Sequence, residues 1–487
     1  MNILLANVSG RLSADGSRLI SALLKQANHQ VKCVFFARRE PLNYEEIEFF
    51  ELASLLEESE LVLVAVYSSY VIRAINLTNY IHKNYPQKLV IWGGPHCISV
   101  PELSLAYADG VCFSDGDEVV VDFVNRLESG KNYLETPNMG FSVNGSFKIN
   151  ETLPPFTDLD KLPFYDFNLE GHFILDRKLI PMTKEILRDG HAGYPFNKPI
   201  LFTITSRGCP HNCSYCNNCR FVAMFGHNKI RSYSVSRVIK ELKYTLDKFD
   251  FFRLVGIGDD DFFVRPTEEI EDFAKQYKEQ IDLPFGIAIS ANTYRREKME
   301  PLLGAGLKLI QMGVQSGSER VLIEVYNRKI SLSRTRAAIK DIEAYMKKYG
   351  LMLLLDFIID NPYETKEDII QTYNFILDLP PKATFNIFYL AFFPGTPLYE
   401  RAIKDGIIEE IEENSFRFYS SSGTTLRYQK NYETFLILLV KKLYTRFPTK
   451  IPRLLTFLRF LGSTPFRVAG SMIPSAFYAG LSKLISR

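Results

Sequence analysis

The sequence has 487 residues, 46% of them hydrophobic and 23% charged, which excludes a disordered or collagen-like chain. This length is enough for about three domains. The net charge is only +2, but residues 430–487 hold ten Lys and Arg and a single acidic residue, so the rest of the chain is acidic overall.

The sequence also argues against secretion and against a membrane span. Met1–Asn7 lacks the basic start and the long apolar run of a secretory signal. No stretch reaches the roughly 18 apolar residues that a membrane-spanning helix needs. We therefore expect a cytoplasmic protein, in which seven cysteines do not indicate a disulfide framework.

Residues 1–135 alternate between short apolar runs and segments with the spacing of amphipathic helices. Apolar strands flanked by helices are typical of a parallel sheet covered on both faces. We predict an α/β domain with a doubly wound, Rossmann-like sheet whose ligand binds at the carboxyl ends of the strands. The predicted strands are Ile3–Ala6, Val31–Phe36, Leu61–Tyr67, Leu89–Trp92 and Gly110–Phe113.

Small residues follow four of these predicted strands. Such residues would let a ligand approach backbone N–H groups, although they also form ordinary tight turns. The candidates for ligand binding are Ser9, Gly10, Ser68, Ser69, Gly93, Gly94 and Gly116.

Residues 136–195 are rich in Pro, Asn, Gly and aromatic residues, and we expect an ordered linker with a small hairpin around Asn144-Gly145. Residues 196–410 again alternate strand and helix signals. Six such units fit a partial (β/α)6 barrel, with ligands at the carboxyl ends of the strands. The predicted strands are Leu201–Thr205, Arg253–Ile257, Phe285–Ser290, Leu309–Gly313, Met352–Ile359 and Thr384–Ala391.

Four of the seven cysteines lie close together just after the first predicted barrel strand. Cys209, Cys213 and Cys216 have the spacing CxxxCxxC. Three thiolates on one loop can bind three irons of a 4Fe–4S cube and leave the fourth iron open for chemistry. A zinc site with Cys219 as a fourth ligand is the competing interpretation, but zinc sites usually add a second pair of cysteines on a separate loop. The third interpretation is that these cysteines are inert thiols that bind no metal.

This segment, with Tyr215 before its third cysteine, resembles the radical S-adenosylmethionine (SAM) superfamily. Two later segments resemble the same family: Met312–Leu322, in which Gln315 stands where the family usually has Glu, and Phe393–Tyr399. The first 135 residues are similar to the cobalamin-binding domain that is fused to one large branch of the family. The resemblance covers residues 1–410.

The resemblance implies cofactor ligands. Cys209, Cys213 and Cys216 would hold one 4Fe–4S cluster, whose open iron would chelate SAM. Asp259 and Asp260, in a run of three acidic residues at the barrel rim, are candidate catalytic residues that would face the SAM ammonium group or the substrate; a solvated loop is the alternative. The candidates for contact with the adenine and ribose are Tyr215, Ser290, Asn292 and Gln315.

Two positions depart from the family pattern. The first domain has no DxHxxG motif, so cobalt should lack a histidine ligand from such a motif. His96 could replace it, but a histidine in a turn is more often structural. Asp360 stands where the superfamily commonly has Gly, and the sequence offers no reason for it.

The implied function is methylation of an unactivated carbon in a small-molecule or lipid-like substrate, with cobalamin as the methyl carrier. Oxidation, cyclisation or rearrangement with the same cofactors is the alternative, and a non-catalytic cobalamin or redox sensor is an alternative of another class. The enzyme would need an electron donor such as flavodoxin or ferredoxin. We expect no nucleic-acid partner, because the barrel region is acidic and lacks a basic groove with interleaved aromatic residues.

The composition and spacing of residues 411–487 predict a basic helical region. Ile451, Leu454, Leu455 and Leu458 recur at helical spacing, with Arg453 among them. One interpretation is a cap that packs its apolar faces on the barrel. The other is peripheral contact of residues 430–487 with anionic lipid, which would make the cytoplasmic protein membrane-associated.

Overall fold

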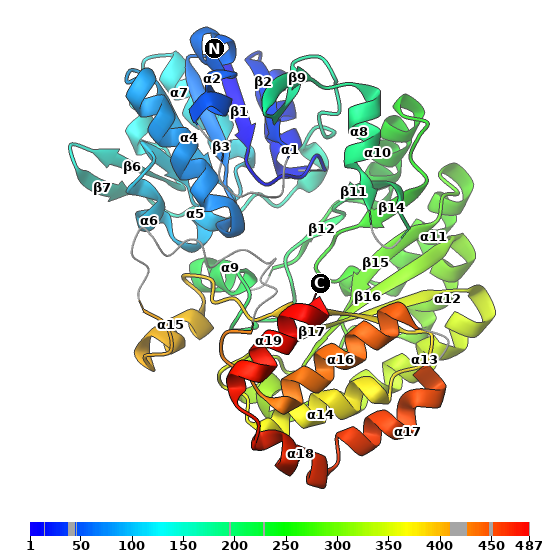
Figure 1. Cartoon of the computed structure of the whole chain (residues 1–487). Coiled ribbons are helices and arrows are strands. Elements are labelled where there is room, and N and C mark those ends of the chain that lie inside the picture. The colour runs from blue at the N-terminus through cyan, green and yellow to red at the C-terminus, as the bar shows by residue number, and fades with distance from the viewer. Residues whose placement is uncertain are drawn as a thin grey trace.

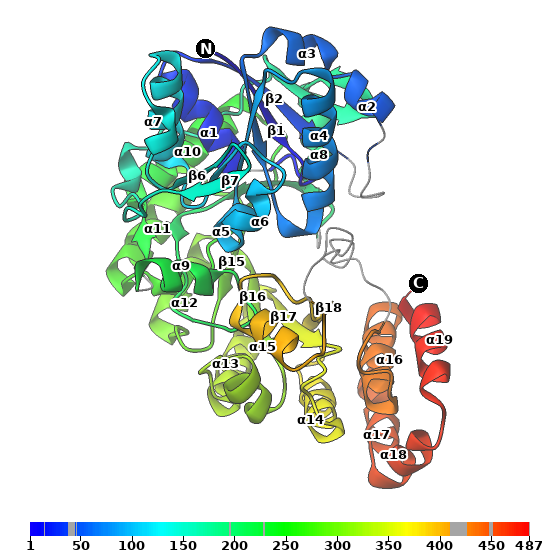
Figure 2. The same cartoon turned by 90° about the vertical axis from the view of Figure 1, so that its left-hand side faces the viewer.

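The fold is that of two α/β units and a helical layer, seen in a computed structural model (Figure 1). The structure describes residues 1–13, 15–37, 44, 46–193, 196–226, 229–409, 426–447 and 451–486. Figure 2 shows the same arrangement from the side, with the helical layer beside the second unit. The expected α/β fold class, with two sheets and a helical C-terminal region, is confirmed.

The first sheet is parallel at its centre, as expected. Its order around the centre is β5-β4-β3-β1-β2, so the strand order reverses between β1 and β3. The strands are β1 (Asn2–Asn7), β2 (Gln30–Phe36), β3 (Leu61–Ala65), β4 (Leu89–Gly93) and β5 (Gly110–Cys112). This reversal is the topological switch point at which such sheets bind ligands.

Helices cover both faces of this sheet because successive strand residues point to opposite sides. Leu5 and Leu63 pack with α1 (Asp15–Gln26) and α7 (Asp117–Glu128) in one buried cluster. Leu4 and Val64 pack with α4 (Val71–Asn84) in another. The short helices of this unit include α2 (Glu46–Phe50), α3 (Ala53–Glu58), η1 (Ser68–Tyr70), α5 (Pro95–Ser99), α6 (Pro101–Leu105) and η2 (Tyr133–Glu135).

Much of the segment expected to be a linker belongs instead to the edges of the first sheet. The predicted hairpin is present as β6 (Met139–Val143) and β7 (Ser146–Ile149), with positive φ at both Asn144 and Gly145, and it extends the sheet beyond β5. At the other edge, β8 (His172–Asp176) pairs in parallel with β2 and is followed by β9 (Lys178–Pro181). Burial of the apolar side chains of Met139, Phe141 and Leu175 favours the addition of these strands to the sheet. Local sequence does not reveal pairings between strands that are so far apart in the chain.

The second sheet curls into a half-barrel, and each of its six predicted strands is present. Five helices connect and cover them: α10 (Val235–Lys248), α11 (Thr267–Gln280), α12 (Arg296–Ala305), α13 (Leu332–Tyr349) and α14 (Lys366–Leu377). The strands, in spatial order, are β10 (Ala192–Gly193), β11 (Lys198–Thr203), β14 (Leu254–Ile257), β15 (Phe285–Ile289), β16 (Leu307–Gln315), β17 (Met352–Ile359) and β18 (Thr384–Tyr389).

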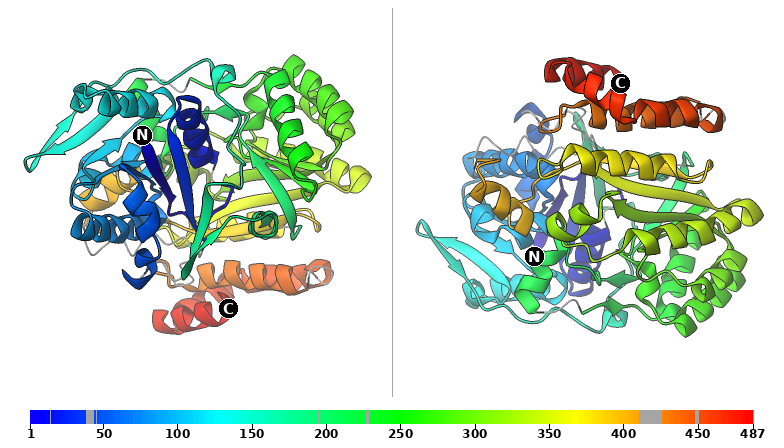
Figure 3. Two further views of the ribbon diagram at one scale, coloured as in Figure 1. Left: turned by 90° about the horizontal axis from the view of Figure 1, so that it is seen from above. Right: turned by 90° about the horizontal axis from the view of Figure 1, so that it is seen from below.

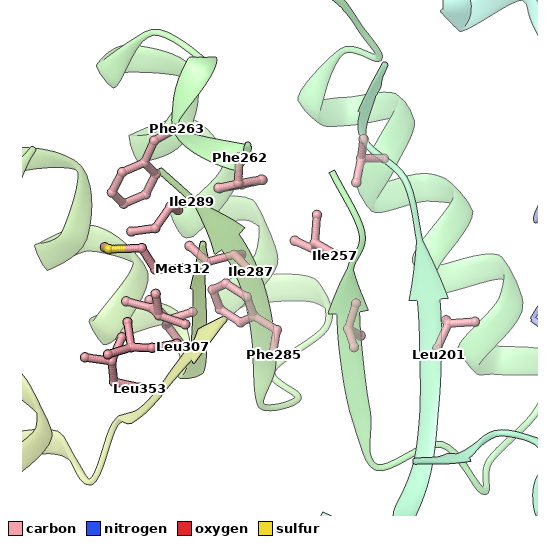
Figure 4. Packing of buried hydrophobic residues seen from close by; sticks show 14 of the residues in the cluster. Leu201, Ile257, Phe262, Phe263, Phe285, Ile287, Ile289, Leu307, Met312 and Leu353 are labelled. Atoms are coloured by element: carbon pink, nitrogen blue, oxygen red, sulfur yellow. The ribbon is translucent and has the colours of Figure 1, made fainter. Parts of the chain in front are cut away.

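Apolar side chains on the outer face of this sheet pack against the covering helices. Figure 4 shows Ile257, Phe285 and Ile287 on neighbouring strands within this cluster. Phe285 lies edge-on to Phe273 of α11, with 5.9 Å between ring centroids. The same packing holds the carboxyl ends of the strands, where the candidate site lies, in fixed positions.

The C-terminal region forms a layer outside α14. It consists of α16 (Tyr432–Arg446), α17 (Ile451–Leu461), α18 (Thr464–Ser471) and α19 (Ser475–Ser486), whereas α15 (Pro397–Lys404) lies on the side of the first unit (Figure 3). α16 packs on α14 and β18, as the cap interpretation predicts, and α19 packs on α16. Residues 411–425, 448–450 and 487 of the predicted tail lie outside the described residues.

Asp360 joins this layer to the half-barrel. It follows β17 with φ of 62°, and its carboxylate accepts hydrogen bonds from the backbone N–H groups of Arg427 (2.7 Å), Tyr428 (2.9 Å) and Gln429 (2.7 Å). Gly would tolerate this backbone conformation but could not accept these bonds. The departure from the family pattern is thus explained by attachment of the C-terminal layer.

None of the helices within the described ranges combines the length and the apolar character needed to cross a bilayer.

Candidate active site

Two adjoining cavities lie where the carboxyl ends of both sheets face each other. The larger has a volume of about 360 Å³ and belongs mainly to the first unit. The smaller, of about 220 Å³, lies beside Cys209 in the second unit. Four residues line both cavities and form the wall between them: Asp115, Ile204, Arg207 and Phe221.

The larger cavity is lined mainly by apolar side chains and by several glycines. Gly93, Gly94 and Gly116, which lie at or after the carboxyl ends of β4 and β5, line it, and their contact with a ligand stays a prediction. At Gly94 φ is 102°, and an added Cβ would lie 2.9 Å from the carbonyl oxygen of Val66, so no other residue fits without strain. The apolar lining residues from the sheet and from α1 and α7 are Leu5, Leu63, Ile91, Leu19, Ile20 and Val120.

Four other predicted residues of the first unit do not line this cavity. The Ser9 hydroxyl donates to Asn7 Oδ1 at 2.6 Å, next to Gly10 in its turn. Ser68 is buried with its Oγ 3.0 Å from His96 Nδ1 in the turn that also holds Ser69. The two serine hydroxyls thus contact neighbouring side chains, and none of the four residues is part of the cavity lining.

The three predicted cluster ligands lie on the loop between β12 (Ser206–Arg207) and α9 (Asn218–Phe225), which Figure 1 shows between the two sheets. Cys213 is buried, whereas Cys209 and Cys216 are partly exposed. Burial raises the pKa of Cys209 to about 12 and that of Cys216 to about 11. These thiols would need a positive centre, such as a metal cluster, to become thiolates.

The donor set on this loop fits an iron–sulfur cube. Within the described part of the chain, no three His, Cys, Asp or Glu side chains converge closely enough to hold a single metal ion. A cube requires no such convergence, because each thiolate binds a different iron. Cys219 is buried in the first turn of α9, and of the four cysteines on this segment Cys209 alone lines the smaller cavity.

Arg328 is a buried partner of the cluster loop that sequence analysis missed. Its Nη1 lies 3.5 Å from Cys213 Sγ, and its Nη2 donates to the carbonyl oxygen of Gly313 at 2.9 Å. An added Cβ at Gly313 would lie 2.6 Å from Gln315 Nε2 and 3.2 Å from Arg328 Nη2. The absence of a side chain at Gly313 therefore leaves space for both side chains at the end of β16. No local sequence motif predicts this requirement.

The four residues predicted to contact adenine and ribose lie around the cluster loop but line neither cavity. The Tyr215 ring lies edge-on to Tyr326 at 4.9 Å. Ser290 Oγ lies 3.1 Å from Thr293 Oγ1, and Asn292 donates to the carbonyl oxygen of Lys329 at 2.9 Å. Gln315 has φ of 72° and folds back over Gly313. Contact of these residues with SAM stays a prediction.

The three acidic residues after β14 have different surroundings. Asp259 is buried, and its carboxylate accepts four hydrogen bonds of 2.5–3.0 Å from the backbone and side chains of Thr205 and Ser206. Asp261 is buried too and accepts from Thr293 Oγ1 at 2.8 Å. The Asp259 carboxylate thus binds the residues at the start of the cysteine loop, and its contact with SAM or substrate stays a prediction.

Asp260 alone of the three lines the smaller cavity. Its Oδ2 accepts a hydrogen bond from Asn218 Nδ2 at 3.0 Å. Loss of hydration raises its pKa, and the nearby charges of Asp259 and Asp261 raise it further. A cationic group in the cavity would stabilise the ionised carboxylate of Asp260 and lower its pKa.

Ion pairs join the two units at the wall between the cavities, and sequence analysis missed them. Arg207 Nη1 lies 2.6 Å from Asp117 Oδ2, and Arg231 Nη1 lies 2.5 Å from Asp115 Oδ2. Asp115 and Asp117 precede and begin α7, whereas the arginines come from β12 and from β13 (Arg231–Ser232). Although burial acts in the opposite direction, the carboxylates of Asp117 and Asp115 raise the pKa of Arg207.

A polar cluster on the concave face of the half-barrel was also missed. Asp356 of β17 accepts hydrogen bonds from Gln311 Nε2 of β16 at 2.6 Å and from Asn386 Nδ2 of β18 at 2.9 Å. These three residues lie on the face opposite to Met312, which packs among the apolar residues of the core. Their alternation with apolar residues along each strand is the signal that could have found them.

Several known proteins are similar to this chain. Residues 203–376 match the radical SAM superfamily. The chain is 26% identical over 384 residues to an uncharacterized methyltransferase of Pyrococcus horikoshii, over 75% of this chain and 74% of the relative. It is 23% identical over 314 residues to the anaerobic magnesium-protoporphyrin IX monomethyl ester cyclase of Rubrivivax gelatinosus, over 61% of this chain and 50% of the cyclase.

A solved structure shares the fold. It is that of TsrM, a radical SAM methyltransferase from Kitasatospora setae, with cobalamin and a [4Fe-4S] cluster bound. The TM-score is 0.64 at 14% sequence identity, and the similarity covers 84% of this chain and 76% of TsrM.

Proposed function

We propose that this chain is a cobalamin-dependent radical SAM methyltransferase, because residues 203–376 match the radical SAM superfamily and the chain is similar to an uncharacterized methyltransferase. Its substrate would be a small molecule with an unactivated carbon, and a one-electron donor such as flavodoxin or ferredoxin would reduce the cluster. Similarity to an uncharacterized methyltransferase and to the fold of TsrM supports this proposal.

The residues of the second unit suit a cluster and SAM. Cys209, Cys213 and Cys216 would hold the cluster, and Arg328 would donate a hydrogen bond to the Cys213 sulfur. Asp260 would accept a hydrogen bond from the amino group of SAM in the smaller cavity, where its unpaired charge is unfavourable. Asp259 would act as a positioning residue through Thr205 and Ser206.

The residues of the first unit suit cobalamin. The apolar depth of the larger cavity matches the aromatic base of that cofactor, and the backbone at Gly93, Gly94 and Gly116 is open to its polar side chains. No histidine is found among the described residues that line this cavity, so a histidine ligand to cobalt is not expected. When bound, the cluster with SAM supplies a radical, and cobalamin carries a methyl group.

The single observation that carries the proposal is the common wall of the two cavities. A methyl carrier in one and a radical source in the other would both face a substrate placed at Arg207 and Phe221. The ion pairs of Arg207 and Arg231 hold the two units in register there. Such positioning is what the protein contributes when cofactors carry the chemistry.

The test is anaerobic turnover of reconstituted enzyme with methyl-labelled SAM, a reductant, cobalamin and cell extract. We expect 5′-deoxyadenosine together with a labelled product, both detected by mass spectrometry, and neither with the Cys213→Ala variant. Absence of 5′-deoxyadenosine from enzyme that holds its full cluster would refute the proposal.

A second candidate function is oxidation or cyclisation with the same cofactors. The similarity to the cyclase of Rubrivivax gelatinosus favours it. The same experiment separates the two functions, because this candidate predicts 5′-deoxyadenosine without transfer of the label to any product.

A further inference from the structure

Helices α17–α19 present an apolar outer surface. Six large side chains on this stretch are exposed, although comparable residues of α16 are buried. The exposed fractions are 56% for Phe457, 55% for Phe460, 51% for Val468, 79% for Met472, 41% for Ile473 and 53% for Phe477. We call these six residues the apolar ridge.

The apolar ridge is continuous from helix to helix. Phe457 and Phe460 are three residues apart and so share one face of α17. The Phe460 ring lies 4.5 Å from that of Phe466 in α18, which connects the two helices. Val468 and Met472 are four residues apart and continue this surface toward α19.

The inner side of the layer is firmly attached, so exposure of the ridge does not reflect a loose tail. Leu458 is fully buried, and its carbonyl oxygen accepts a hydrogen bond from Tyr373 of α14 at 2.5 Å. Arg459 pairs with Asp378 at 2.7 Å, and Arg467 pairs with Glu367 at 3.1 Å. The cations of the layer thereby neutralise the acidic residues closest to it.

The charge of this segment identifies the chemistry of a partner. Residues 451–487 contain five Lys and Arg and no Asp or Glu. A second copy of the chain would bring two segments of like charge together, which opposes self-association. Exposed apolar side chains on a segment of net positive charge, in helices too short to span a bilayer, suit the surface of an anionic membrane.

We propose that the apolar ridge of α17–α19 inserts into the surface of anionic lipid membranes. Phe457, Phe460 and Met472 would enter the boundary between headgroups and acyl chains. The net positive charge of residues 451–487 would add electrostatic attraction to the lipid phosphates. This docking would hold the enzyme on a membrane whatever reaction it catalyses.

The experiment is sedimentation of full-length, reconstituted protein with vesicles of phosphatidylcholine alone or mixed with phosphatidylglycerol, at low and high salt. We expect binding to the anionic vesicles that weakens with salt. The variant Phe457→Ser/Phe460→Ser/Met472→Ser should lower the affinity by about tenfold or more, because it removes only side chains that the protein leaves in water.

The matched control is Ile323→Ser, which removes a side chain of similar exposure (54%) far along the chain from the ridge. It should bind as the unmodified protein does. Failure of the unmodified protein to bind anionic vesicles, or equal binding by the triple variant, would overturn the proposal. So would a dimer in light scattering that the triple variant abolishes, since the ridge would then be an interface between copies. None of these measurements depends on enzymatic activity.

Discussion

Gly94 occupies a backbone conformation that only glycine adopts readily. Its φ of 102° and ψ of −176° lie outside the regions open to residues with a Cβ. We expect Gly94→Ala to lower the free energy of unfolding by about 1–3 kcal/mol and to weaken cobalamin binding. Urea denaturation and spectroscopic titration with cobalamin measure the two effects.

Gly93→Ala is the matched control for this substitution. An added Cβ there would meet only the Cys112 Cβ, at an ordinary 3.8 Å. Its stability should therefore stay close to that of the unmodified protein. Equal destabilisation by the two variants would show that strain at Gly94 is not the cause.

The CxxxCxxC thiols differ from Cys219 in their expected contribution to the cluster. Reconstituted protein should hold about four irons, and Ala at Cys209, Cys213 or Cys216 should abolish both the iron and the cleavage of SAM. Cys219→Ala should keep both. Loss of the cluster through Cys219→Ala alone would mean that the ligand assignment is wrong.

The start of α14 combines a strong cap with a buried acid. Thr365 and Asp368 form a capping box, and Asp368 also pairs with Arg320 at 2.5 Å. Glu364, just before this cap, is buried with its Oε1 3.4 Å from Ser316 Oγ. Burial, and then the negative charge of Asp368, raises the pKa of Glu364 to about 8.

This raised pKa predicts a dependence of stability on pH. Between the ordinary pKa of a glutamate and about 8, the folded protein keeps a proton that the unfolded chain releases, so stability falls as pH rises. Glu364→Gln should remove this dependence, so its free energy of unfolding should rise relative to that of the unmodified protein by about 3–4 kcal/mol between pH 5 and pH 8. Urea midpoints measured across this range test it; parallel pH profiles for the two proteins would contradict it.

The ion pairs across the cavity wall link the two halves of the molecule. Arg207→Ala would leave the buried carboxylate of Asp117 without its partner. We expect a loss of about 3 kcal/mol in the free energy of unfolding, and partial recovery in Arg207→Ala/Asp117→Ala, in which neither charge remains. A double-mutant cycle by urea denaturation measures this coupling.

The cycle has a clear negative outcome. If the double variant loses as much stability as the sum of the two single variants, the pair does not couple the units. Iron content should be unchanged in all three variants, because none of them alters a proposed cluster ligand.

The sequence alone determined most of the strands and helices of both units, though not β8 and β9, and the position of the cysteine loop. Apolar runs such as Ile3–Ala6 and Met352–Ile359, and the spacing of Cys209, Cys213 and Cys216, are local patterns with a direct physical meaning. The hairpin at Asn144-Gly145 was predictable for the same reason, since both residues accept positive φ.

Only the tertiary structure decided which side chains meet. The pairing of β8 with β2, the hydrogen bond of Arg328 to Cys213, and the ion pair of Arg207 with Asp117 join residues that are 90 or more positions apart. It also showed that Asp259 holds Thr205 and Ser206, and that Asp360 holds the C-terminal layer. A local pattern shows which interactions a residue is able to make. The packing of the whole chain decides which partner forms hydrogen bonds or ion pairs with each buried polar or charged group. It therefore also decides which acidic side chains have lone pairs left for a ligand.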